Sequence, residues 1–305
     1  MRLHLNDDQH QILGALDALT RPYLDSAAAE AGLFTCSEAL NSELAQSGFL
    51  DVMADEDLGA VTAALVAEKL ARLPQAIEAG ASALVRPALD IALRGPVCLV
   101  EPARLARPIR FLRPDAAVIV VDKERVRSFT ARSEMIEPAS ADSLYAYPVA
   151  FLKEIPADAR THDLPASEAI RLWRVALSAE LSGLMAAALE NICGYLAERK
   201  QFGRPLATFQ ALRHRLAELQ VAINGLYWMA MKAAGSEDGG DAAMAALLAQ
   251  ETAKRAAYDF HQLMGGMGMT LEHPMHLWTY RMKLLTAELG GSGAQALAAA
   301  DAIWG

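Results

Sequence analysis

The sequence predicts a mainly α-helical protein with one small β domain. Ala, Leu and Met outnumber Val, Ile and Thr in the 305 residues, a composition that favours helix. Apolar residues recur at helical spacing near both ends of the chain, whereas short β-branched runs between prolines occupy the middle. We therefore expect an N-terminal helical domain over residues 1–95, a reduced β domain over 96–160 and a helical bundle over 161–305.

The N-terminal part carries the pattern of several short helices. In residues 7–19, Ile12, Leu13, Leu16 and Leu19 form a stripe at helical spacing. Residues 44–51 indicate a helix end with a glycine stop. Further Ala/Leu-rich helices are expected at residues 58–73 and 79–93, before a Gly-Pro break.

The middle part has the pattern of a small β domain. Six prolines, the first at Pro102 and the last at Pro156, separate short apolar runs. Strands are expected at residues 97–100, 117–121, 126–130 and 147–152.

The last part carries long helical patterns joined by short connections. A helix is expected after Pro165, with Ser167 and Glu168 in capping positions. The expected helices cover residues 169–200, 209–234, 241–264, 275–288 and 294–304. Long helices with short loops pack as an antiparallel bundle, and we expect four of them to form its body.

Composition and charge exclude several classes of function. The net charge is −9 and no Lys/Arg run is present, which argues against nucleic-acid binding. The first residues are polar and acidic, unlike a secretory signal, and no uninterrupted apolar run reaches the ~18 residues of a membrane span. Cys36, Cys98 and Cys193 stand among apolar neighbours and are expected to be reduced core thiols of a cytoplasmic protein. The pair His273 and His276 lacks an evident third ligand, so no metal site is expected.

Two motifs in the last part point to a ligand. Arg199 stands at the expected end of a long helix, where a cation often only complements the helix dipole. Its planar guanidinium also suits a diphosphate, and Gln201, Phe202 and Gly203 follow it. About sixty residues on, Gln262 precedes a helix end and a Gly-Gly-Met-Gly turn, where backbone N–H groups can approach a ligand closely.

Together these motifs resemble the carboxy-terminal helical domain of acyl-CoA dehydrogenases. The resemblance is specific in residues 195–210 and 262–274, plausible in the N-terminal helices and poor in the β segment. In that family the corresponding residues hold the ADP half of an FAD that is bound mainly by the neighbouring subunit. By this resemblance the cofactor-binding residues are Arg199, Gln201, Phe202, Gln210, Gln262, Gly265 and Gly266.

The residues that the resemblance would make catalytic are absent. Family members remove the substrate's α proton with a glutamate in one of two positions, which fall here on Leu289 and Trp173. Neither side chain can accept a proton. Glu288 stands one place early, a rotation of about 100° on a helix, and Glu180 lies two turns beyond Trp173. The β segment also lacks the family's glycine–serine run and tryptophan strand, so we expect no catalytic residue in this chain.

The resemblance thus implies a non-catalytic subunit. It would complete the FAD site of a catalytic acyl-CoA dehydrogenase subunit in an α2β2 assembly, with the acyl-CoA bound mainly by the partner and an electron-transfer flavoprotein as acceptor. Heteromeric members of this kind are associated with steroid side-chain β-oxidation. Two alternatives remain open at this stage: a homodimeric dehydrogenase that uses Glu288 or Glu180 as a displaced base, and a flavin-free assembly subunit.

Overall fold

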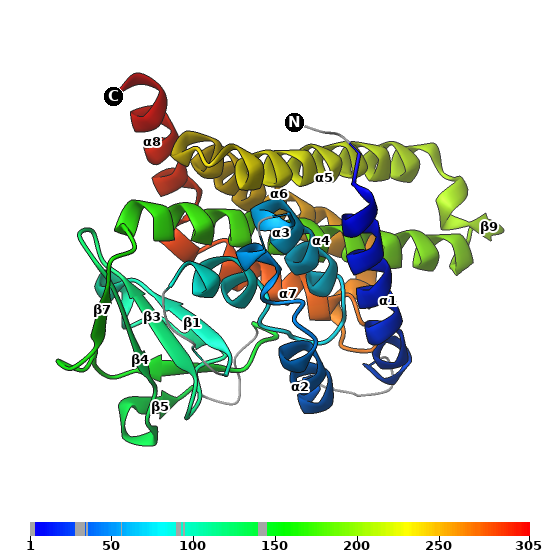
Figure 1. Ribbon diagram of the computed structural model, residues 1–305. Coiled ribbons are helices and arrows are strands. Elements are labelled where there is room, and N and C mark those ends of the chain that lie inside the picture. The colour runs from blue at the N-terminus through cyan, green and yellow to red at the C-terminus, as the bar shows by residue number, and fades with distance from the viewer. Residues whose placement is uncertain are drawn as a thin grey trace.

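A computed structural model describes residues 4–27, 34, 36–55, 57–89, 93, 95–139 and 145–305. Helices make up the two ends of the chain and pack against one another, while the β strands form a separate layer at one end of the helical body (Figure 1). The prediction of a mainly α protein with a small β region is confirmed.

The N-terminal helices are α1 (Asp7–Ala27), α2 (Glu38–Gln46) and α3 (Gly59–Ala71), with the short 3₁₀ helix η1 (Val52–Ala54) between the last two. Gly48 has a φ of +78° and follows α2, as the predicted glycine stop requires. The helix predicted at residues 79–93 is wrong. That segment forms a π-helical turn, η2 (Ala81–Val85), and a 3₁₀ turn, η3 (Arg86–Ala88). Pro87 lies inside η3, and a proline removes an N–H donor and disfavours helix in the residue before it. Residues 90–92, near the end of the predicted helix, lie outside the described residues.

The β region consists of two small sheets. One has the order β1-β3-β4-β7 and the other the order β2-β6-β5. The strands are β1 (Val97–Val100), β2 (Ile109–Arg110), β3 (Ala117–Val121), β4 (Val126–Thr130), β5 (Ile136–Pro138), β6 (Val149–Leu152) and β7 (Arg160–His162). The predicted strands correspond to β1, β3, β4 and β6, whereas the two- and three-residue strands β2, β5 and β7 were not predicted.

The C-terminal part is built on α4 (Ala166–Glu198), which packs against α5 (Gln210–Ser236), α6 (Gly239–Met264) and α7 (His276–Leu285). The last helix, α8 (Gly291–Trp304), packs on α6. The predicted helices are therefore confirmed, but the predicted cap at Ser167 is wrong. Pro165 occupies the N-cap position and α4 begins at Ala166, because the fixed φ of proline is compatible with a helix start. Glu168 instead forms an ion pair with Arg171 at 2.6 Å.

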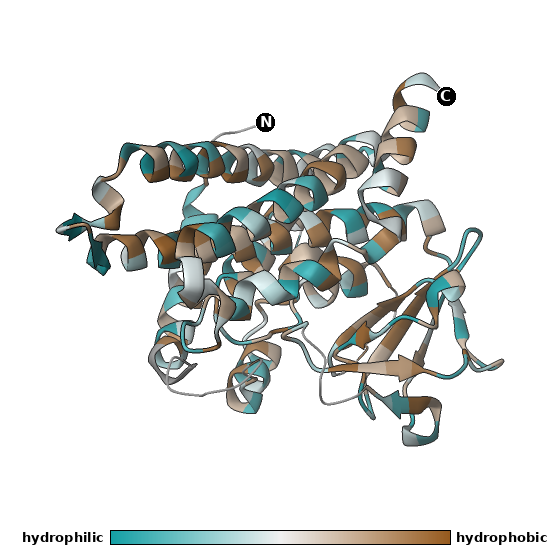
Figure 2. Ribbon diagram, turned by 180° about the vertical axis from the view of Figure 1, so that it is seen from behind, coloured by the Kyte–Doolittle hydropathy of each residue, from teal (hydrophilic) through white to brown (hydrophobic). Residues whose placement is uncertain are grey.

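A close helix crossing joins the N-terminal and C-terminal parts. A Cβ built at Gly183 of α4 would lie 2.0 Å from the carbonyl oxygen of Glu68 in α3, so only glycine fits there. Apolar residues, whose ribbon is brown in Figure 2, are frequent in these helices, and their buried side chains form the core. Within the described residues, α4 alone is long and apolar enough to cross a membrane, and 89% of its most apolar window is buried inside the protein.

The cysteines differ from the prediction. Cys98 is buried, as expected, but Cys36 and Cys193 are exposed, and each of the three is reduced rather than in a disulfide. Cys193 lies on α4 between the buried Ile192 and the exposed Gly194, so its apolar neighbours did not indicate which helix face it occupies.

Candidate functional site

The first predicted motif forms a small hairpin at the end of α4. Arg199 is the C-cap residue, with extended ψ (119°), so the chain leaves the helix there and enters β8 (Lys200–Gln201) and β9 (Arg204–Pro205). Phe202 and Gly203 form the tip with φ of +54° and +80°, and Phe202 is 88% exposed. The ribbon of the two hairpin strands is mostly teal in Figure 2, because most of their residues are hydrophilic. The structure thus presents the motif to solvent.

The arginines of this hairpin differ in what they contact. Arg204 stacks its guanidinium over the ring of Phe209 at 4.1 Å, and Phe202 meets the same ring edge-on at 6.0 Å. Among the described residues, none forms an ion pair with the exposed Arg199. Gln210, the first residue of α5, is exposed and faces His214 across one turn at 3.3 Å. Arg199 is therefore free to meet an anion from outside the chain.

The second predicted motif ends α6. Gly265 is the C-cap with φ 58° and ψ −136°, a conformation that side-chain-bearing residues rarely adopt, and the 3₁₀ helix η7 (Gly265–Met269) follows. We call this segment the glycine turn. A Cβ built at Gly265 or Gly266 meets nothing within 4 Å, and both glycines and Gln262 are exposed. The turn therefore leaves open space in front of its backbone.

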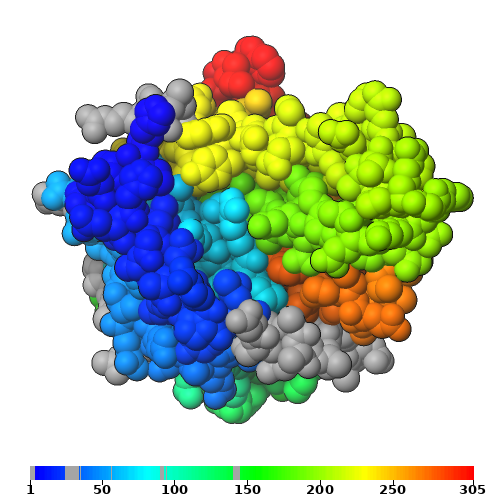
Figure 3. Space-filling view, turned by 90° about the vertical axis from the view of Figure 1, so that its right-hand side faces the viewer, coloured from blue at the N-terminus to red at the C-terminus, as the bar shows by residue number. Residues whose placement is uncertain are grey.

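The two motifs lie at the same end of the bundle. Tyr195, in the last turn of α4, packs edge-on against His273, just past the glycine turn, with ring centroids 5.5 Å apart. Figure 3 shows the hairpin end of α4 and α5 (green) beside the glycine turn and the start of α7 (orange). A free guanidinium and an open glycine backbone at one surface fit the diphosphate and sugar of a dinucleotide such as FAD.

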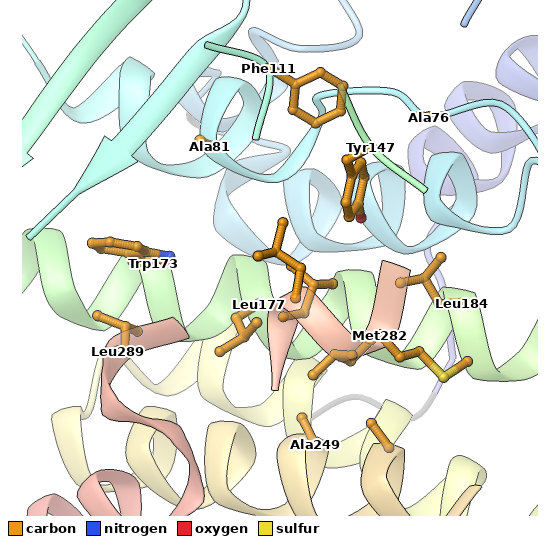
Figure 4. Close-up of a cluster of buried hydrophobic side chains, with 14 of the residues drawn as sticks. Ala76, Ala81, Phe111, Tyr147, Trp173, Leu177, Leu184, Ala249, Met282 and Leu289 are labelled. Carbon is orange, nitrogen blue, oxygen red and sulfur yellow. The ribbon is translucent and has the colours of Figure 1, made fainter. Parts of the chain in front are cut away.

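The two positions that the resemblance assigns to a base are filled by apolar side chains. Trp173 on α4 is 3% exposed, and Leu289 in the turn η8 (Glu288–Gly290) is 8% exposed. Both belong to one apolar cluster (Figure 4). Leu289 has φ +49° and ψ +29°, a left-handed conformation that costs of order 1 kcal/mol in a leucine. Neither side chain can accept a proton.

The two alternative carboxylates, Glu180 and Glu288, are both bound by one buried arginine. Arg110 Nη1 lies 2.8 Å from Glu180 Oε2, and Arg110 Nε donates to Glu288 Oε1 at 2.9 Å. Burial alone would lower the pKa of Arg110, but the two carboxylates raise it well above its usual value. The guanidinium is therefore a permanent cation between them.

Each carboxylate also has a second donor. Trp173 Nε1 donates to Glu288 Oε2 at 2.8 Å, and the backbone N–H of Gly80 donates to Glu180 Oε1 at 3.2 Å. Burial raises the pKa of Glu288, whereas Arg110 and the Trp173 hydrogen bond oppose this rise. Each oxygen of Glu288 thus accepts one hydrogen bond, and these two contacts hold the carboxylate in place against Arg110 and Trp173.

Sequence reasoning missed the residues that hold this network. Gln250 donates to the carbonyls of Leu285 (3.1 Å) and Glu288 (3.0 Å), and Gln295 donates to that of Leu289 at 2.6 Å. They fix the turn that carries Glu288 and Leu289. The signal for Arg110 was present, because a charge inside the apolar run Pro108-Ile109-Arg110-Phe111 has to be paired when buried.

A cavity of 230 Å³ adjoins the network. Arg110, Trp173, Glu288 and Leu289 are among the residues that line it. Arg104 and Arg107 also line it, and both donate to the carbonyl of Ala287, at 3.3 and 3.1 Å. The cavity therefore contains paired charges and apolar walls. Within the described residues, no three His, Cys, Asp or Glu side chains are grouped so as to hold a metal ion.

Comparison with known proteins agrees with the C-terminal motifs. Residues 165–303, just under half of the chain, match the family model of the acyl-CoA dehydrogenase C-terminal domain. The acyl-CoA dehydrogenase FadE28 of Mycobacterium tuberculosis is 35% identical over 134 residues, 42% of this chain and 40% of that protein. IpdE2 of the same organism, also an acyl-CoA dehydrogenase, is 39% identical over 107 residues, 35% of this chain and 34% of that protein. The matches thus span about a third to two fifths of these relatives.

Solved structures match the whole fold. An acyl-CoA dehydrogenase of Geobacillus kaustophilus superposes with a TM-score of 0.76 at 15% identity, covering 99% of both chains. A variant of the Tcur3481–Tcur3483 steroid ACAD gives 0.70 at 22% identity, covering 97% of this chain and 98% of that one. The ChsE4–ChsE5 complex of M. tuberculosis gives 0.69 at 17%, covering 97% of both. The chain therefore has the acyl-CoA dehydrogenase fold, and its residues 165–303 are similar in sequence to the C-terminal domain of the acyl-CoA dehydrogenase family.

Proposed function

We propose that this chain is a non-catalytic subunit of a heteromeric acyl-CoA dehydrogenase. It supplies the hairpin and the glycine turn that bind the ADP half of an FAD held mainly by a catalytic partner subunit. The observation that carries the proposal is the contrast between its two sites. The cofactor-facing surface is open and has a free Arg199, whereas the position of its own base is filled by Trp173 and Leu289.

The internal ion network supports the same conclusion. A general base must reach the substrate proton with a free lone pair at hydrogen-bond distance. Glu288 has an acceptor contact at each oxygen, and Glu180 is 4% exposed and paired with Arg110. This favours a non-catalytic chain over a homodimeric enzyme with a displaced base.

The residues proposed for the FAD contact divide by chemistry. Arg199 would pair with the diphosphate, and the backbone of Gly265 and Gly266 would approach the same nucleotide closely. Gln201, Gln210 and Gln262 offer exposed amides, and the exposed ring of Phe202 offers a stacking face. When bound, FAD supplies the hydride acceptor for α,β-dehydrogenation of an acyl-CoA.

Two structural neighbours support a proposal for the substrate class and the partner. Two of the structural neighbours are two-protein assemblies, and one of them is described as a steroid ACAD. We infer an α2β2 assembly that acts on a bulky, steroid-type acyl-CoA in side-chain β-oxidation in the cytoplasm. The acyl-CoA binds mainly to the partner, and an electron-transfer flavoprotein accepts the electrons.

Expression with and without a partner tests this proposal. The chain is purified alone and then co-expressed with acyl-CoA dehydrogenase genes from its genomic neighbourhood, and the flavin absorption spectrum is recorded for each product. The proposal predicts a colourless chain alone and a yellow complex that oxidises an acyl-CoA. A yellow, active homodimer would instead establish a displaced base, and a colourless complex would establish a flavin-free assembly subunit; either result would refute the proposal.

A further inference from the structure

The glycine turn folds back tightly on the end of α6. Gly268 is buried, and a Cβ built there would lie 2.8 Å from Met264 Cβ and 2.9 Å from the carbonyl oxygen of His261. Beyond it, Thr270 closes the turn by donating from its hydroxyl to the carbonyl of Met267 at 3.0 Å. The backbone of Gly268 thus touches the helix one turn before the open glycines Gly265 and Gly266.

One side chain bridges this contact. Nδ1 of His261 lies 2.5 Å from the carbonyl oxygen of Gly268. A carbonyl only accepts, so the neutral imidazole carries its proton on Nδ1. Nε2 is buried without a hydrogen-bond partner among the described residues, and the ring stacks on Tyr280 of α7 with centroids 6.2 Å apart. The ring is therefore held on one side by α7 and on the other by the turn.

We propose that His261 is a positioning residue for the cofactor surface: its hydrogen bond to Gly268 holds the glycine turn in the form that meets the FAD nucleotide. This inference rests on the proposed function, because it assumes that the turn contacts FAD. His261 itself does not touch the cofactor surface; it acts through the backbone of the turn.

The same geometry makes the turn sensitive to acid. A second proton on His261 would sit at Nε2, where no acceptor is present. Burial lowers the pKa of His261, the bond to Gly268 opposes this, and Lys283 lowers it further. The titratable groups around the ring are Tyr280, which stacks on it, and Lys254, Tyr258 and Lys283, which line the same cavity as His261. His276 and Lys283 also contact the ring of Tyr280.

The sign of the pH effect follows from the lowered pKa. The neutral imidazole is favoured in the folded turn, so its full contribution is present above the ordinary histidine pKa of about 6.5. It is lost as the pH falls below that value toward the lowered pKa, where protonation places an unsatisfied cation in the turn. FAD retention by the complex should therefore weaken on acidification through this group.

The test uses the co-purified complex with three variants. His261→Ala removes the hydrogen bond, His261→Asn keeps an amide donor at the place of Nδ1 without a titratable ring, and His10→Ala is an exposed control on α1. The FAD dissociation constant is measured from pH 8 to pH 5.5, and amide exchange of residues 265–270 is followed by mass spectrometry. Loss of one hydrogen bond should raise the dissociation constant about three- to tenfold.

The inference predicts weaker FAD binding and faster exchange of the turn for His261→Ala, recovery at pH 8 for His261→Asn, and a flatter pH dependence for His261→Asn than for the parent. Unchanged binding in His261→Ala, or the same pH dependence in His261→Asn as in the parent, would overturn it. Arg199→Ala, measured in parallel, separates the two claims. If Arg199→Ala weakens FAD binding and His261→Ala does not, the proposed function stands and the role of His261 is wrong.

Discussion

Arg110 is a buried cation that forms ion pairs with two carboxylates. Its guanidinium is 10% exposed and binds Glu180 and Glu288, which lie 70 and 178 residues away along the chain. Breaking a buried pair of this kind leaves an uncompensated charge, which typically costs about 3–5 kcal/mol. These ion pairs therefore matter for the stability of the fold, independently of any catalysis.

This network leads to a prediction for Glu288. Glu288→Gln keeps the shape of the side chain and an acceptor oxygen for Trp173 or Arg110. The turnover of the assembled complex with an acyl-CoA should stay within about twofold of the parent, because no proton is transferred to this group. A general base contributes roughly 10²–10⁴ in rate, so a loss of that size, with the complex still assembled and yellow, would show that Glu288 is the base.

Arg199 carries a second prediction at this scale. Arg199→Ala should weaken FAD binding by the complex by about one to two orders of magnitude, since a charge-assisted contact contributes roughly 1.5–3 kcal/mol. Arg199→Lys should recover only part, because an ammonium lacks the planar fork. Equilibrium dialysis of the flavin measures both. Arg204→Lys is a useful comparison, since Arg204 is already stacked on Phe209. If Arg199→Ala leaves the FAD affinity unchanged, Arg199 only complements the helix dipole and does not bind the cofactor.

At the scale of elements, helical periodicity predicted the C-terminal helices well. The helix predicted at residues 169–200 is α4 (Ala166–Glu198), because a long run of Ala and Leu allows no competing structure. The strands β2, β5 and β7 have two or three residues and exist through pairing with distant strands, so no local pattern indicated them. The hairpin and the glycine turn could be located from the sequence because their residues are close together in the chain. The role of Arg110 could not, because its partners lie 70 and 178 residues away.

The crossing of α3 and α4 provides a matched pair of glycine substitutions. Gly183→Ala would place a methyl group 2.0 Å from the carbonyl oxygen of Glu68, and overpacking of this kind costs about 1–3 kcal/mol or more. Gly194→Ala, on the same helix, meets nothing within 4 Å and should stabilise the helix by about 0.5–1 kcal/mol. Denaturant unfolding followed by circular dichroism compares them. Equal effects from the two changes would mean that the helices do not approach as described.

At the scale of the whole molecule, two places in the acyl-CoA dehydrogenase fold contrast with each other. The hairpin and the glycine turn lie together and open at one end of the bundle, beyond the contact of Tyr195 with His273. At the positions of the base, the apolar side chains of Trp173 and Leu289 and the ion pairs of Arg110 line a cavity of 230 Å³. Under the proposed function, this chain would bind FAD only beside a partner that supplies the rest of the site.

The number of flavins in the assembly tests this account most directly. The co-purified complex is weighed by light scattering, its subunit ratio is measured, and FAD released by denaturation is quantified by absorbance. One cofactor surface from this chain and one complete partner form one site, so the account predicts two FAD per α2β2 assembly. Four FAD per assembly would contradict it, because this chain would then build a flavin site of its own around Trp173, Leu289 and the Arg110 network.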